Sequence, residues 1–219
     1  MDAFDFELRQ AQGQRSETWI QDRLGKFTAS EIHRIIGEPK SAQNKEHGLT
    51  DAAQKYCWEK IGERLSGVPA SNEFVNEHMM RGIELESVAR AEFEKLMNHP
   101  IIDAVFVPFT DCAGGSPDGY YGHKGIIEIK CPDTDTHLQY RLMTEPNDLP
   151  KAYYWQIQAN LLFTASDFCY FISYDDRVSN ELRLFALYVE ANEEAHAEIV
   201  RKIEQAETFC RKMINQLTA

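Results

Sequence analysis

The segment that most constrains the fold is residues 125–131, where the sequence alternates as Gly-Ile-Ile-Glu-Ile-Lys-Cys. This alternation predicts a β-strand. Successive side chains of a strand point to opposite faces, so Glu128 and Lys130 share one face while Ile127 and Ile129 point into a core. The chain therefore holds a carboxylate and an ammonium group side by side on a strand whose other face is buried.

A second acid, Asp118, precedes this strand in the turn sequence Pro-Asp-Gly. Antiparallel pairing can bring Asp118 beside Glu128 and Lys130, and the complete pattern is P-D-x9-E-x-K. Two carboxylates can hold a hard divalent cation such as Mg²⁺, with waters and substrate oxygens as the other ligands. The backbone carbonyl of Ile129, which lies between the two charged side chains, is a further candidate ligand.

These residue types fit the hydrolysis of a phosphodiester. A bound cation polarises the phosphoryl group and lowers the pKa of an attacking water. Lys130 can orient that water or balance the charge that develops on the phosphorus oxygens. The alternative is an exposed Glu–Lys ion pair, which contributes little to stability. A bare D…E-x-K pattern also occurs by chance, so the flanking sequence has to decide.

The charge balance argues against a protein that binds nucleic acid through a generally basic surface. Lys and Arg number 23 and Asp and Glu 35, which gives a net charge of −12. The five cysteines form no C-x-x-C pair and the histidines no H-x-H pair, so neither a disulfide framework nor a zinc site is expected. No apolar run reaches the ~18 residues of a membrane span, and the first residues lack a signal-peptide pattern. We expect no membrane partner and a cytoplasmic location, in a bacterium or a phage-infected host.

The periodicity along the chain predicts helices, then a short sheet, then helices. This order indicates a single domain over residues 1–219 of the mixed α/β (α+β) class. Residues 37–48 have no periodicity and are predicted to be an exposed loop. Thr28 and Glu31 fit a capping box that opens a helix. The predicted helices cover residues 19–24, 29–36, 50–65, 76–97, 152–164 and 193–217, and the predicted strands cover 101–109, 125–131, 168–174 and 182–189.

Five blocks, in the same order, resemble the lambda exonuclease family, also known as the YqaJ-type viral recombinases, of the PD-(D/E)XK nuclease superfamily. The first is W-x3-R-x-G-x2-T-A-S at residues 19–30, and the second is a G-x3-E helix at residues 81–90. The catalytic core is matched by Ser-Pro-Asp-Gly at 116–119 and Glu-Ile-Lys-Cys-Pro at 128–132. A Q-x-Q helix follows at residues 154–158. The resemblance extends over residues 19–189.

The resemblance implies a role for each matching acid and for the lysine. Asp118 and Glu128 would bind Mg²⁺, for which Mn²⁺ could substitute, and Lys130 would serve the attacking water. Glu86 would complete the acidic cluster from its helix. A solvent-exposed position on that helix is the alternative for Glu86, because the neighbouring Glu84 leaves the register open.

The resemblance also implies a site for a terminal 5′-phosphate. Arg23 would grip the phosphate through its bidentate fork, and Ser30 would add a hydroxyl at the start of a helix. Ser116 would be a polar support. The alternatives are a surface role for Arg23 and a helix-capping role for Ser30.

A further polar support of the site is expected from the Q-x-Q helix. Gln156 and Gln158 are two residues apart on a helix and face different ways. Gln158 is selected for the site, and Gln156 is a secondary candidate. The adjacent residues Tyr153, Tyr154 and Trp155 either stack on bases or pack in the core.

As a whole, the resemblance implies a restriction-endonuclease-like core, in which helices flank a central mixed β-sheet. The implied activity is a 5′→3′ exonuclease on linear double-stranded DNA that releases mononucleotides and leaves a 3′ single strand for strand-annealing recombination. A homotrimeric ring and a single-strand annealing protein as partner are also implied. Two alternatives remain open: a structure-specific or nicking endonuclease, and a non-catalytic DNA-binding recombination scaffold.

Overall fold

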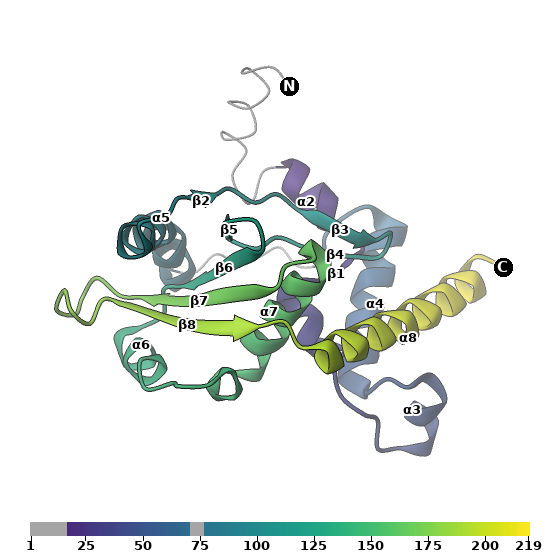
Figure 1. Cartoon of the computed structure of the whole chain (residues 1–219). Coiled ribbons are helices and arrows are strands. Elements are labelled where there is room, and N and C mark those ends of the chain that lie inside the picture. Colours follow the sequence, from purple (N-terminus) through teal and green to yellow (C-terminus); the bar gives the residue numbers. More distant parts are fainter. Residues whose placement is uncertain (1–16, 71–76) are drawn as a thin grey trace.

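The computed structural model describes residues 17–70 and 77–219. The first residues, on which the predicted lack of a signal peptide rests, and Asn76 lie outside this part. The elements, shown in Figure 1, are α2 (Glu17–Arg23), β1 (Phe27–Thr28), the 3₁₀ helix η1 (Ala29–Arg34), α3 (Ala42–His47), α4 (Asp51–Ser66), α5 (Glu77–Met97), β2 (Ile101–Ile102), β3 (Val107–Thr110), β4 (Ala113–Gly115), β5 (Gly119–Tyr121), β6 (Gly125–Lys130), α6 (Thr134–Tyr140), the 3₁₀ helix η2 (Pro146–Asp148), α7 (Lys151–Thr164), β7 (Phe168–Tyr174), β8 (Leu184–Glu190) and α8 (Glu193–Thr218).

A five-stranded mixed sheet in the order β2-β5-β6-β7-β8 forms the centre of the fold. β6 and β7 pair in parallel, and the other neighbouring strands pair antiparallel. Figure 1 shows α5 and α6 on opposite sides of these strands. Ile127 and Ile129 of β6 pack with Phe93 of α5 on one face. Ile126 packs with Ile157 of α7 on the other face, which is also the face of Glu128 and Lys130.

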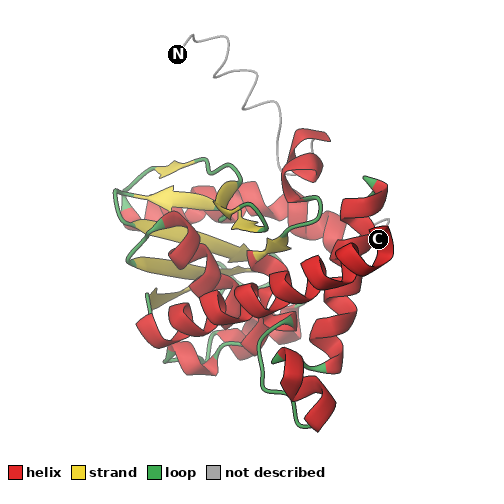
Figure 2. Cartoon of the chain, turned by 90° about the vertical axis from the view of Figure 1, so that its right-hand side faces the viewer, coloured by secondary structure: helices red, strands yellow, loops and turns green. Residues whose placement is uncertain are grey.

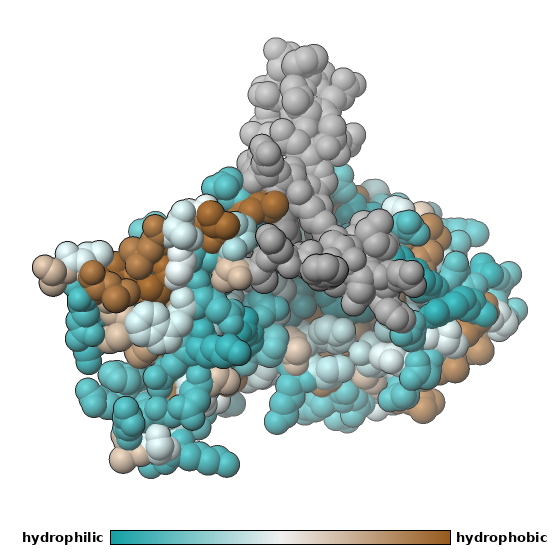
Figure 3. Space-filling view, turned by 180° about the vertical axis from the view of Figure 1, so that it is seen from behind, coloured by the Kyte–Doolittle hydropathy of each residue, from teal (hydrophilic) through white to brown (hydrophobic). Residues whose placement is uncertain are grey.

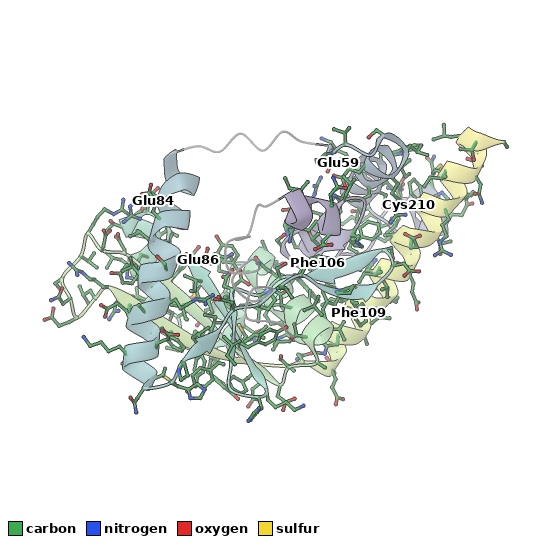
Figure 4. The ribbon with its side chains drawn as sticks, turned by 90° about the horizontal axis from the view of Figure 1, so that it is seen from above. Glu59, Glu84, Glu86, Phe106, Phe109 and Cys210 are labelled. Carbon is green, nitrogen blue, oxygen red and sulfur yellow. The ribbon has the colours of Figure 1, made fainter. Side chains whose placement is uncertain are left out.

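A smaller sheet in the order β1-β4-β3 joins this core to the helices. Phe109 of β3, labelled in Figure 4, stacks on Phe163 of α7 with 4.8 Å between ring centroids. Beyond this sheet, α8 packs along α4 and α7, and Figure 2 shows α8 lying across the helical half of the molecule. The apolar residues of α8, among them Ile199, Ile203 and Phe209, are buried against η1 and α4.

The predicted mixed α/β fold is confirmed. A helix flanks each side of the central sheet, and the predicted strand at residues 125–131 is β6. The division into one domain over the whole chain stays a prediction. The predicted strand at 101–109 is instead two strands in different sheets, because β2 pairs with β5 and β3 pairs with β4.

Two local predictions near the start of the chain are wrong. The helix after Thr28 is of the 3₁₀ type, and the Thr28 side chain accepts no capping hydrogen bond. Its hydroxyl instead lies 3.3 Å from the Ser30 hydroxyl. The predicted loop at residues 37–48 contains α3, which Ser41 caps by accepting the Asn44 N–H.

The surface and the helices give two further observations. In the rear view of Figure 3, hydrophilic residues cover most of the described surface, as expected for a chain with a net charge of −12. Among the residues that the structure places, no helix is both long enough and apolar enough to cross a membrane.

Candidate active site

The ladder of β5 and β6 brings Asp118 beside the end of β6 that carries Glu128 and Lys130. Gly119 pairs with Ile127 in this antiparallel ladder, and Asp118 lies immediately before Gly119. The Asp118 N–H donates to the Ile127 carbonyl at 3.1 Å, and the Asp118 carboxylate accepts the Ile129 N–H at 2.6 Å. Arg90 of α5 donates to the Asp118 carbonyl. The second acid is therefore fixed at the end of the ladder by both its backbone and its side chain.

The Glu128 carboxylate is 1% exposed and has three donors in this face of the sheet. Lys130 Nζ donates to Oε1 at 2.6 Å. Gln156 Nε2 also donates to Oε1, at 2.5 Å, and Asn160 Nδ2 donates to Oε2 at 3.2 Å. The last two donors are one turn apart on α7, so they reach Glu128 from the same side.

The burial and the charges around Glu128 and Lys130 shift the pKa values of both side chains. Burial is the largest effect on Glu128 and raises its pKa to about 7 against the opposing charge of Lys130, while the Asp118 and Glu86 carboxylates act in the same direction as burial. For Lys130, burial acts against the charged form, but the carboxylates of Glu128 and Asp118 raise its pKa above the usual value. The lysine therefore stays protonated, with its Nζ also 5.0 Å from the centre of the Tyr153 ring.

Glu86 lies on the side of α5 that faces the strands, whereas Glu84 lies on the outer side (Figure 4). The position of Glu86 agrees with its electrostatic effect on two residues of the strand end. Burial and the Glu86 charge raise the pKa of Cys131 to about 12, and Glu86 also acts on Glu128. The register that the sequence left open is thus the one that turns Glu86, and not Glu84, toward the strands.

Two of the residues predicted for the 5′-phosphate, Arg23 and Ser30, contact each other, and the small sheet places Ser116 at the same end as Ser30. Arg23 Nη2 donates to the Ser30 hydroxyl at 3.0 Å. Because Thr28 pairs with Gly114 in the parallel β1–β4 ladder, Ser30 and Ser116 both follow this pair by two residues at the same end. The Ser116 hydroxyl is buried, and it neither donates nor accepts a hydrogen bond within the part of the chain that the structure describes. A buried hydroxyl without a partner is costly, which favours a polar ligand at this position.

The structure reverses the predicted choice between the two glutamines. Gln158 donates to the Glu190 carbonyl at 2.9 Å and accepts the Asn192 N–H at 2.9 Å. It therefore fixes the connection between β8 and α8, because a side chain two residues from Gln156 points to a different face of α7. Gln156 is the glutamine that contacts the carboxylate cluster.

Asn160 is the site residue that the sequence analysis missed. It is fully buried and contacts Glu128. A signal was present in the four-residue spacing of Gln156 and Asn160, which places both amides on one helix face. Packing accounts for the aromatic residues of α7. Tyr153 and Tyr154 lie against the core that includes Ile157, and Trp155 lies against the core that includes Ile199 and Ile203 of α8.

The donor set at this site fits a hard divalent cation. Asp118 and Glu128 offer carboxylate oxygens at the same end of the β5–β6 ladder, and burial raises the pKa of Glu128 because it disfavours the charged carboxylate. A cation beside this carboxylate would favour its charged form. Within the described segments, no three Asp, Glu, His or Cys side chains are grouped so that they could together hold a metal ion. Mg²⁺ keeps several waters and is commonly bound by one or two carboxylates, so a pair of acids matches this ion.

Comparison with known proteins identifies the family to which the chain belongs. The sequence profile of the YqaJ-like viral recombinase domain matches residues 18–167. The chain is similar to an alkaline exonuclease, LHK-Exo, from Laribacter hongkongensis, with 31% identity and a TM-score of 0.79 over 93% of this chain and 96% of that one. The same enzyme in complex with dAMP gives 31% identity and a TM-score of 0.78 over 92% and 96% of the two chains.

A phage-related exonuclease from Haemophilus somnus 129PT shares the fold. It has 21% identity and a TM-score of 0.74 over 88% of this chain and 96% of that one. No curated protein matches the chain significantly. The similarity to LHK-Exo indicates a DNA nuclease. On the profile match and the 31% identity, the chain belongs to the YqaJ-like viral recombinase domain family.

Proposed function

We propose that this protein is a Mg²⁺-dependent 5′→3′ exonuclease that degrades one strand of linear double-stranded DNA. It would release mononucleotides and leave a 3′ single strand for strand-annealing recombination. The observation that carries the proposal is that Asp118, Glu128 and Lys130 lie together at one end of the β5–β6 ladder, where Asp118 accepts the Ile129 N–H at 2.6 Å and Lys130 Nζ is 2.6 Å from Glu128. The dAMP complex of LHK-Exo supports a nucleic-acid substrate.

In the proposed mechanism, Asp118, Glu128 and the Ile129 carbonyl would hold Mg²⁺, and Mn²⁺ could replace it. The cation, when bound, polarises the phosphoryl group and acidifies water. Lys130, kept protonated by its two carboxylate neighbours, orients the attacking water and balances charge on the non-bridging oxygens. Glu86 adds a carboxylate from α5.

The proposed polarity rests on the Arg23 group. Arg23 and Ser30 are 3.0 Å apart, and Ser116 leads through Pro117 to Asp118. A 5′-phosphate held by these three side chains would place the adjacent phosphodiester toward the carboxylates. The bidentate guanidinium suits a terminal phosphate, which carries more charge than an internal one.

One assay separates this function from its two alternatives. Purified full-length protein with Mg²⁺ is incubated with linear duplexes bearing 5′-phosphate or 5′-hydroxyl ends and with closed circular duplex. Release of mononucleotides from linear DNA alone, faster from 5′-phosphate ends, is the expected result. Cleavage of circles would indicate a structure-specific or nicking endonuclease, and no cleavage with Mg²⁺ or Mn²⁺ would indicate a non-catalytic recombination scaffold.

Assembly is a separate part of the proposal. We propose a homotrimeric ring around the DNA and a single-strand annealing protein that receives the exposed 3′ strand, in the cytoplasm of a bacterium or a phage-infected host. Light scattering coupled to size-exclusion chromatography tests the trimer. A mass of one or two chains at working concentration would contradict it.

A further inference from the structure

Asn160 completes a set of amide donors around the Glu128 carboxylate. Its Nδ2 donates to Oε2 at 3.2 Å, while Gln156 Nε2 donates to Oε1 at 2.5 Å. Each carboxylate oxygen is therefore held by one amide from α7, and Lys130 reaches only Oε1. Rotation of the carboxylate would break contacts on both oxygens, so its plane is fixed by the helix rather than by the lysine alone.

The other end of the Asn160 amide reveals what keeps this side chain in place. Its Oδ1 is buried and accepts no hydrogen bond from the residues that the structure describes. It lies against Gly115 of β4, where an added Cβ would be 2.3 Å from Oδ1 and 2.8 Å from the Ala29 Cβ. Contacts this short do not occur between real side chains, so Asn160 can adopt its position only because residue 115 is glycine.

We propose that Asn160 is a positioning residue for Glu128, that Gly115 provides the space it needs, and that the pair sets the affinity of the carboxylate site for its divalent cation. This inference rests on the proposed function, in which Glu128 is a metal ligand. Groups that hydrogen-bond a metal ligand orient it before the ion arrives, and their loss commonly weakens metal binding by roughly 10- to 100-fold. Among the described residues nothing donates to Oδ1, so packing, rather than a hydrogen bond to Oδ1, holds the Asn160 amide against Glu128.

The direct test is Mn²⁺ binding to the full-length protein without DNA, followed by electron paramagnetic resonance of the free ion. Asn160→Ala should weaken binding at the high-affinity site by about tenfold. Gln158→Ala is the matched control, since it removes a buried amide from the same helix whose partners are Glu190 and Asn192. Its Mn²⁺ affinity should equal that of the wild type. Glu128→Ala gives the background of weak binding to the acidic surface.

A second measurement excludes a merely structural effect. Nuclease activity of Asn160→Ala should recover toward the wild-type kcat when the Mg²⁺ concentration is raised by the factor that the affinity has lost. A folding defect would instead lower activity at every Mg²⁺ concentration. Circular dichroism and the melting temperature of each variant are recorded first.

Gly115→Ala extends the test to the other member of the pair. It should weaken Mn²⁺ binding as Asn160→Ala does, and the double variant should bind no more weakly than the weaker single variant, because both changes remove the same contact. If Gly115→Ala fails to fold, the Asn160→Ala and Asn160→Ser variants alone test the role of Asn160, and both should bind Mn²⁺ more weakly than the wild type.

Two failures are distinguishable. If wild type and Glu128→Ala bind Mn²⁺ equally, the proposed metal site is wrong and with it the proposed function. If Glu128→Ala loses the tight site but Asn160→Ala binds as the wild type does, the proposed function stands and the role of Asn160 is refuted. Additive losses in the double variant would refute the pairing with Gly115.

Discussion

The Asp118 carboxylate replaces a backbone acceptor in the β5–β6 ladder by accepting the Ile129 N–H at 2.6 Å. β5 begins one residue later, at Gly119, and Asp118 already contacts β6 through both its backbone N–H and its side chain. Ile129 lies between Glu128 and Lys130, and the hydrogen bond therefore ties Asp118 to the end of β6 that carries these two charged side chains. In this position Asp118 has a structural contact as well as a charge.

Replacing Asp118 separates these two contributions. Asp118→Asn keeps an oxygen that can accept the Ile129 N–H but removes the charge, so we expect loss of Mg²⁺-dependent cleavage by at least about 100-fold with an almost unchanged stability. Asp118→Ala should also lose about 1 kcal/mol of unfolding free energy, because the buried N–H has no partner. Cleavage rates and urea unfolding of both variants provide the test. Wild-type activity in Asp118→Asn would contradict the metal-binding role.

Lys130→Ala should abolish cleavage while duplex DNA binding is retained. The reason is that the lysine acts on the water and on developing charge, whereas the carboxylates hold the cation. Lys124→Ala is the matched control at the other end of the strand, since Lys124 is 62% exposed and pairs with Asp167 at the surface. Single-turnover cleavage and filter binding measure the two properties. Full activity of Lys130→Ala would refute the assigned site.

Arg23→Ala should remove the preference for phosphorylated ends. The expected ratio of kcat/KM between 5′-phosphate and 5′-hydroxyl duplexes is about one, since the charge and the fork that hold the phosphate are both lost. Arg23→Lys keeps the charge without the fork and should retain part of the preference. A ratio unchanged from the wild type in Arg23→Ala would contradict the phosphate-binding role.

The sequence sufficed to predict the strand that carries Glu128 and Lys130, because alternation is local information. The expected antiparallel pairing of the segment after Asp118 with this strand is also present, as β5 and β6. The choice between Gln156 and Gln158 depends on tertiary packing, which the sequence does not show directly. Their spacing shows that they face different ways, but only the packing of α7 on the sheet decides which face meets Glu128.

The sequence also could not predict that residues 101–109 are divided between two sheets. Ile101 and Ile102 pair with β5, while Val107 pairs with Gly115 across β4. A β-branched run predicts extended backbone but carries no information on its partner. The role of Asn160 depends on Gly115, and such a contact between a helix and a distant strand is visible only in the folded chain.

The buried Asp175 gives a prediction for acid stability. Its side chain is 0% exposed, and it accepts hydrogen bonds from Thr134 at 2.6 Å, Arg177 at 2.8 Å and Arg81 at 2.9 Å. Burial acts to raise its pKa, but the hydrogen bonds from Arg177 and Thr134 prevail and lower the pKa to about 2. These contacts join α5, α6 and the end of β7.

Because the folded-state pKa of Asp175 lies below its ordinary value of 3.8, ionised Asp175 stabilises the fold above about pH 4, and this contribution disappears as the pH falls toward 2. The shift corresponds to about 2 kcal/mol. Urea unfolding of wild type and Asp175→Asn at pH 5, 3 and 2 tests this. The difference in unfolding free energy should shrink by about 1 kcal/mol at pH 3 and by about 2 kcal/mol at pH 2. Asp176→Asn, at a 46% exposed side chain, should cost less than about 1 kcal/mol at pH 7. A difference between wild type and Asp175→Asn that stays constant from pH 5 to pH 2 would show that Asp175 is not held in its charged form by these contacts.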